Sequence, residues 1–163
     1  GLILDPKNYD LYLALGDVYM ANYNLDEAVK SYCDAITVNP DEERGYFKVG
    51  VALWEKEYFE EALVAYHKAV ELNPNNVSAL NNLGILYLDG FIDAEHALEY
   101  FEEAIKINPN YTLAYFNAGR ASQKMEFIND AANYYQMAID LNKLNNELDE
   151  KDIQQRLHQL FET

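Results

Sequence analysis

Three histidines, one cysteine and pairs of adjacent glutamates are the side chains best suited to metal binding, nucleophilic attack or acid–base chemistry. The histidines, which never pair with a second ligand at metal-site spacing, are His67, His96 and His158. Cys33 has no base placed near it to generate a thiolate, so we interpret it as a free thiol, packed or partly exposed. The pairs Glu60-Glu61 and Glu102-Glu103 are typical of solvated helix faces. We therefore expect no enzymatic activity, no bound metal and no cofactor.

Proline and glycine recur along the chain at a nearly constant period. The prolines, each preceded by Asp or Asn, follow one another at intervals of 34, 34 and 35 residues: Pro6, Pro40, Pro74 and Pro109. The glycines in the same phase are Gly16, Gly50, Gly84 and Gly119. A period of this length indicates a stacked array of one structural unit. Such arrays generally offer a binding surface rather than a reactive site.

Each unit carries the pattern of two packed helices. The units begin at Tyr9, Glu43, Val77 and Thr112, and positions four, seven, eight and eleven of each mark one face of a first helix. A stripe of small, aromatic and small residues follows on the second helix, as in Ala28, Tyr32 and Ala35. Glycine at position eight indicates that the second helix approaches so closely that a Cβ would collide with it. An Asn-Pro pair then ends the second helix in the first three units.

These positions resemble the tetratricopeptide repeat, whose pattern of aromatic, Leu-Gly, Tyr, Ala, Phe/Tyr, Ala and Pro spans residues 9–145. The resemblance implies an all-α fold, a right-handed α-solenoid of stacked helix-turn-helix repeats with a C-terminal capping helix. We expect a single domain with its repeats at 9–42, 43–76, 77–111 and 112–145. The third repeat has one residue more than the others, and we expect a local bulge near residues 88–93.

The two ends of the chain also have interpretations. Residues 1–8 align with the end of a preceding repeat and the chain does not begin with methionine, so we expect a fragment of a longer protein. An uncovered first hairpin would allow self-association. Residues 146–163 carry an apolar stripe of Ile153, Leu157, Leu160 and Phe161. We interpret this segment as a capping helix, and the alternative is an open arm that docks on another protein.

Composition limits the partners. The net charge is −16, with 12 basic against 28 acidic residues, which argues against binding to nucleic acid or to an anionic membrane surface. The charge favours a basic partner, or it serves only to keep a tyrosine-rich array soluble. No stretch approaches 18 uninterrupted apolar residues, so we expect no direct membrane insertion and a cytoplasmic location.

In the resembled family the first helices line a concave groove, which implies a set of candidate peptide-binding residues. They are Leu13, Asp17, Phe47, Lys48, Val51, Trp54, Asn81, Asn82, Ile85, Phe116, Asn117 and Arg120. The apolar members are not required by the packing motif and are expected to contact a partner. Leu88 also occupies a groove position, and the alternative for Trp54 and Leu88 is that they cover the turn to the second helix. Asn82 and Asn117 share one repeat position, which resembles the asparagine ladder of the family's sugar transferases, and the alternative is ordinary solvated asparagine.

The resemblance also allows a test for the carboxylate clamp that binds acidic chaperone tails. Its lysine and asparagine positions hold Leu13, Asp17 and Lys48 in one phase, so we predict no binding to such tails. The leading hypothesis is an adaptor that binds an extended or short helical, apolar or basic peptide segment in its groove. The alternatives are a self-associating structural scaffold and the substrate-docking arm of a larger enzyme.

Overall fold

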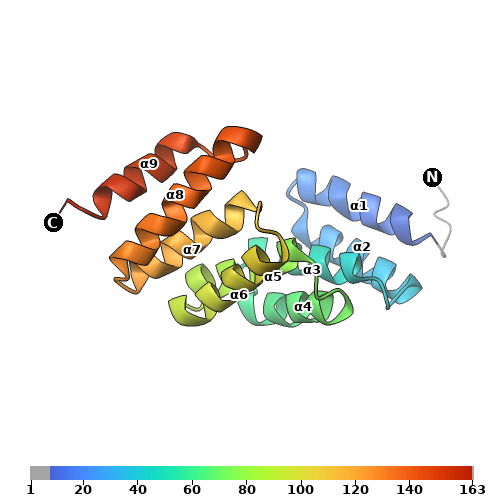
Figure 1. The fold of residues 1–163 in the computed structure, drawn as a ribbon. Coiled ribbons are helices and arrows are strands. Elements are labelled where there is room, and N and C mark those ends of the chain that lie inside the picture. The colour runs from blue at the N-terminus through green and yellow to red at the C-terminus, as the bar shows by residue number, and fades with distance from the viewer. Residues whose placement is uncertain (1–7, 163) are drawn as a thin grey trace. The chain divides into compact units, whose positions relative to one another are not determined.

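The computed structural model describes residues 8–162, which form nine α-helices and one π-helical turn (Figure 1). The chain divides into two compact units, residues 1–79 and 80–163. The repeat tail predicted at residues 1–8 lies, apart from Asn8, outside the described residues.

The first unit consists of two helical hairpins and the start of a further helix. Its elements are α1 (Tyr9–Ala21), α2 (Leu25–Val38), α3 (Glu43–Glu55), α4 (Phe59–Leu72) and the beginning of α5 (Val77–Ile85). Asn8 caps α1 by accepting a hydrogen bond from the Leu11 amide at 3.0 Å. Figure 1 shows α1 beside α2 and α3 beside α4, which is the helix-turn-helix arrangement predicted for each repeat.

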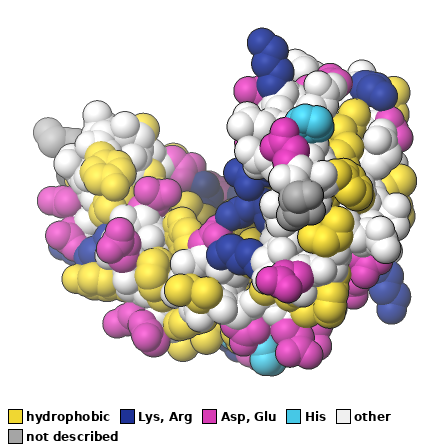
Figure 2. All heavy atoms as spheres, turned by 90° about the vertical axis from the view of Figure 1, so that its left-hand side faces the viewer, with side chains coloured by type: hydrophobic (Ala, Val, Ile, Leu, Met, Phe, Trp, Pro, Cys, Tyr) yellow, Lys and Arg dark blue, Asp and Glu magenta, His cyan; other side chains and the backbone are white. Residues whose placement is uncertain are grey.

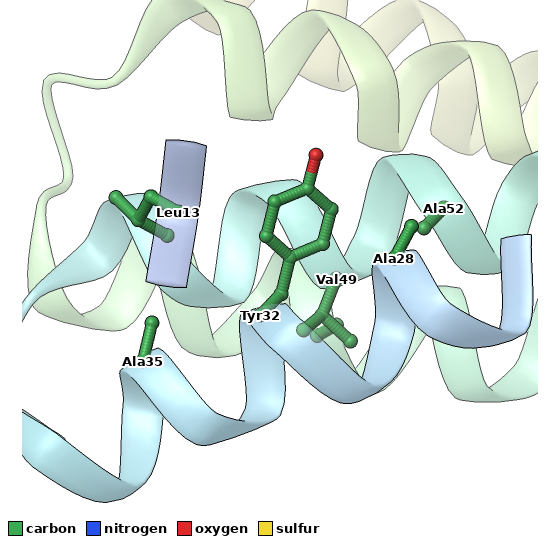
Figure 3. Packing of buried hydrophobic residues seen from close by; sticks show 7 residues of the cluster. Leu13, Ala28, Tyr32, Ala35, Val49 and Ala52 are labelled. Atoms are coloured by element: carbon green, nitrogen blue, oxygen red, sulfur yellow. The ribbon is translucent and has the colours of Figure 1, made fainter. Parts of the chain in front are cut away.

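The stripe of small, aromatic and small residues forms the contact between the two helices of a repeat. In Figure 3 the ring of Tyr32 rises from α2 between Ala28 and Ala35 of the same helix. A Cβ built on Gly16 would lie 2.2 Å from Cε1 of Tyr32, and one built on Gly50 would lie 2.6 Å from the ring of Tyr66. Real Cβ atoms do not approach so closely, so the expectation that glycine is needed for close helix packing is confirmed.

We predict that Gly50→Ala lowers the free energy of unfolding by up to about 2 kcal/mol. Overpacking against the Tyr66 ring costs about 1–3 kcal/mol, and the better helix propensity of alanine offsets about 1 kcal/mol of it. Urea denaturation followed by circular dichroism measures the change. In a Tyr66→Leu background the same substitution should be neutral or stabilising, and a stabilising effect in both backgrounds would contradict the steric explanation.

The second unit contains the end of α5 and the remaining elements. These are η1 (Leu86–Gly90), α6 (Ala94–Ile107), α7 (Thr112–Lys124), α8 (Ile128–Asn145) and α9 (Glu150–Gln159). The extra residue of the third repeat lies in η1, a π-helical turn in which the Phe91 amide donates to the Leu86 carbonyl five residues back at 3.0 Å. The predicted bulge is therefore present as a widened helical turn, which is the usual way a helix accommodates one inserted residue.

The turn that follows the insertion keeps the geometry of the other repeats. One residue between the two helices of each repeat has a left-handed backbone, with φ of 58° at Tyr23, 61° at Glu57, 57° at Ile92 and 61° at Glu126. Ile92 is β-branched, so this conformation is strained there. The insertion is thus accommodated before the turn rather than within it.

The C-terminal helix packs on the fourth repeat. Figure 1 shows α9 alongside α8. Ile153 of α9 and Leu160, which directly follows α9, are buried together with Tyr135, Ala138 and Ile139 of α8. Asn142 of α8 holds the connecting loop by exchanging two hydrogen bonds with the backbone of Leu148, at 2.8 and 2.9 Å. This is the arrangement of a capping helix.

Candidate peptide-binding surface

The first-unit candidates centre on a charged pair between α1 and α3. The Asp17 carboxylate accepts hydrogen bonds from Nζ of Lys48 at 2.6 Å and from the Tyr32 hydroxyl at 2.8 Å. Lys48 also lies over the Tyr32 ring, with Nζ 5.8 Å from its centroid. Burial, and then the bond to the Asp17 carboxylate, raise the pKa of the Tyr32 hydroxyl. The pair is therefore anchored to the core of the first repeat through Tyr32.

The apolar candidates of the first unit differ in what they contact. Phe47 and Val51 are half-buried on one side of α3, and the ring of Phe47 lies 6.0 Å from that of Tyr66. Trp54 packs on Phe59 at 5.1 Å between ring centroids, which covers the turn from α3 to α4. That contact matches the alternative interpretation of Trp54.

Leu13 does not belong on a binding surface. Its side chain is only 4% exposed and lies in the core of the first unit, where Figure 3 shows it near Tyr32. The prediction that Leu13 contacts a bound peptide is therefore wrong. Its apolar side chain is used by the packing between helices instead.

Two asparagines of the second unit pair with each other inside the protein. Asn81 on α5 and Asn117 on α7 are each 3% exposed, and Nδ2 of Asn117 donates to Oδ1 of Asn81 at 3.0 Å. Neither amide lies at the surface, so neither is placed to hold a peptide backbone, and the expectation is corrected for both. Asn82 and Ile85 of α5 are half-buried. The sequence pattern placed Asn82 and Asn117 in one ladder, whereas the structure pairs Asn117 with the neighbour of Asn82.

Arg120 connects this amide pair to the inserted turn. Its guanidinium donates to Oδ1 of Asn117 at 3.1 Å and to both carboxylate oxygens of Asp89 at 2.8 Å. Lys124 donates to the carbonyl of Leu88 at 3.2 Å, and the Leu88 side chain is fully buried. Sequence reasoning did not include Asp89 among the site residues. The one-residue insertion in the third repeat could have indicated Asp89, because Asp89 lies in the widened turn that the insertion produces.

Phe116 lies under the C-terminal helix rather than in an open groove. Its ring is 6.0 Å from that of Tyr135, and the Arg156 guanidinium of α9 lies 5.5 Å from its centroid. Phe116 remains half-buried. Repeat spacing could not predict the contact with Arg156, because α9 lies outside the repeat pattern.

The surface carries many acidic side chains (Figure 2). Figure 2 shows acidic side chains across the face that it presents, with hydrophobic side chains between them. Within residues 8–162 no group of three or more His, Cys, Asp or Glu side chains could hold a metal ion. No helix in this part of the chain combines the length and the apolar character needed to cross a membrane.

Sequence comparison identifies the repeats. Family models of the tetratricopeptide repeat match residues 9–42 and 77–111, and a TPR repeat model matches residues 55–90. Among curated proteins, the peroxisomal targeting signal receptor of Eremothecium gossypii is 36% identical over 82 residues, which cover 50% of this chain and 14% of that receptor. The match therefore spans a small part of that relative's length.

Solved structures share the fold. The crystal structure of MamA has a TM-score of 0.79 at 25% identity, covering 88% of this chain and 84% of MamA. The first TPR of Spaghetti (RPAP3), solved with the HSP90 peptide SRMEEVD, has a TM-score of 0.70 at 21% identity, covering 77% and 98% of the two chains. These likenesses confirm the predicted all-α solenoid of helix-turn-helix repeats.

Proposed function

Because this chain belongs to the tetratricopeptide repeat family, we propose that it binds a peptide segment of another protein through the first helices of its repeats. Proteins of this architecture act as interaction modules that present extended surfaces to their partners. We propose no catalytic role for these residues. The matched curated relative is named as a receptor for a targeting signal, which supports recognition of a peptide segment.

The observation that carries the proposal is the half-buried apolar side of α3 and the charged pair beside it. Phe47 and Val51 lie one helical turn apart and are not required by the packing between repeats. The Asp17 and Lys48 side chains beside them are 50% and 31% exposed. An apolar ligand side chain would rest on Phe47 and Val51, and the net charge of −16 would favour a basic residue in the same ligand.

Acidic chaperone tails are not the ligand that we propose. One of the clamp positions holds Asp17, whose carboxylate would repel a terminal carboxylate of the ligand. Asp17 already neutralises Lys48, the cation beside it. The peptide bound to RPAP3 in the compared structure is therefore outside the ligand class proposed for this chain.

A random peptide library displayed against the purified chain tests the proposal. We expect enrichment of peptides with apolar and basic residues, and a loss of affinity of at least about tenfold in a Phe47→Ala/Val51→Ala variant. Leu144→Ala is the matched control, because it removes another apolar side chain that is 85% exposed on α8. Equal binding by both variants, or no enrichment at all, would refute the proposed surface. Light scattering on the same samples reports any self-association.

A further inference from the structure

One position of the second helix is small in the first two repeats and aromatic in the last two. Counted three residues after the conserved alanine of each repeat, this position holds Ser31, Ala65, Tyr100 and Tyr134. Tyr100 stacks on Tyr87 with 5.5 Å between ring centroids. The side chain at this position therefore decides how the space beside the second helix is filled.

Tyr134 fills that space in the second unit. Its hydroxyl donates to Oε1 of Glu102 on α6 at 2.7 Å, and its ring lies 6.5 Å from that of Tyr115 on α7. It packs on a cluster that includes Ala118 and Ile105. The tyrosine ring thus lies among residues of α6, α7 and α8.

The corresponding space in the first unit is open. Between α2, α3 and α4 lies a groove of 580 Å³ with almost wholly apolar walls, which we call the Ala65 groove. Its lining residues are Cys33, Ile36, Thr37, Tyr46, Val49, Leu53, Glu61, Val64, Ala65 and Lys68.

Two wall residues of the Ala65 groove are identical to the equivalent residues around Tyr134. The equivalent residues lie at the same repeat positions two repeats later. Tyr46 corresponds to Tyr115, Ile36 to Ile105, and Ala65 to Tyr134 itself. The groove is therefore the space that a tyrosine side chain occupies in the second unit. A smaller hollow of 250 Å³ lies at the same position of the first repeat, where Ser31 is also small.

The charges at the rim of the groove are unequal. Lys68 pairs with Glu71 at 2.8 Å, so its charge is neutralised. Glu61 is exposed and forms no ion pair with any residue in the range 8–162. The rim therefore favours a cation next to whatever enters the groove, in keeping with the net charge of −16.

We propose that the Ala65 groove binds an aromatic side chain, tyrosine or phenylalanine, of a partner segment that carries basic residues beside it. The ring would lie against Tyr46, Val49 and Val64 as Tyr134 lies against its own neighbours, and a basic neighbour would pair with Glu61. The site is separate from the peptide surface proposed above. On α3 the groove uses Tyr46 and Val49, whereas that surface uses Phe47 and Val51.

Titration with three capped tripeptides tests the proposal in the full chain. Lys-Tyr-Lys is the probe, Lys-Ala-Lys removes the ring, and Glu-Tyr-Glu reverses the charge. We expect Lys-Tyr-Lys to shift the methyl NMR signals of Val49, Val64 and Ala65 and to slow thiol modification of Cys33, the single cysteine. Both control peptides should bind at least about tenfold more weakly. Equal effects of Lys-Tyr-Lys and Lys-Ala-Lys, or no shift by Lys-Tyr-Lys, would overturn the proposal.

Two variants locate the binding. Ala65→Tyr should fill the groove with the protein's own side chain and abolish both effects of Lys-Tyr-Lys. Tyr134→Ala should open an equivalent space and add new shifts at Ala118 and Ile105. Binding that persists unchanged in Ala65→Tyr would place the probe elsewhere and refute the site. The Phe47→Ala/Val51→Ala variant should bind Lys-Tyr-Lys normally, which separates this result from the outcome for the proposed peptide surface.

Discussion

Replacement of Ile153 by alanine is expected to lower the free energy of unfolding by about 2–5 kcal/mol. Ile153 is fully buried against Tyr135 and Ala138 of α8, so truncation leaves a cavity where α9 meets the fourth repeat. Urea denaturation followed by circular dichroism measures the loss. The size of the effect reports how firmly α9 is held on the array.

Phe161→Ala is the matched control for Ile153. Phe161 belongs to the same apolar stripe of the sequence, yet it is 63% exposed. Its replacement should change stability by no more than about 0.5 kcal/mol. If both substitutions had equally small effects, α9 would not be packed in solution, and the open-arm interpretation of this helix would be favoured.

Asn81→Leu is expected to reduce stability by about 1–3 kcal/mol. The substitution removes the acceptor of the Asn117 amide, which then remains in the interior without its partner. Adding Asn117→Leu should recover part of the loss because both buried amides are then absent. Denaturation of the two single variants and the double variant measures their coupling, expected at about 0.5–3 kcal/mol.

Asn133→Leu serves as the control for the asparagine cycle. Asn133 is exposed on α8, so its replacement should leave stability within about 0.5 kcal/mol. Additive effects of Asn81→Leu and Asn117→Leu would contradict the pairing of the two amides. Such a result would return Asn117 to the set of candidate peptide contacts.

The starts of the first helices could be predicted because the same packing residues recur at the same positions of every repeat. Predicted repeat starts at Tyr9, Glu43, Val77 and Thr112 coincide with the first residues of α1, α3, α5 and α7. Gly50 and its equivalents must be glycine because an aromatic ring occupies the space of their Cβ atoms. Such local contacts recur at fixed spacing, so they leave a periodic signal in the sequence.

The candidate surface was less predictable, because the same repeat position can face the interior or the solvent. Leu13 and Phe47 share position five of their repeats, yet Leu13 is in the core and Phe47 is half-exposed. The peptide-binding role of the remaining candidates stays a prediction. Two of the candidates contact residues that lie outside the repeat pattern. Arg120 pairs with Asp89 in the widened turn, and the Phe116 ring lies against Arg156 of α9.

The sequence by itself determined the family, the first residue of each repeat's first helix and the place of the insertion, because these follow from residues that are close along the chain or repeat at a constant interval. Only the tertiary structure decided which side chains meet across different helices. It paired Asn117 with Asn81, packed α9 on α8 and left the Ala65 groove open where Tyr134 fills its counterpart. These outcomes depend on side-chain volume and on hydrogen-bond partners in three dimensions, which the period of a sequence does not record.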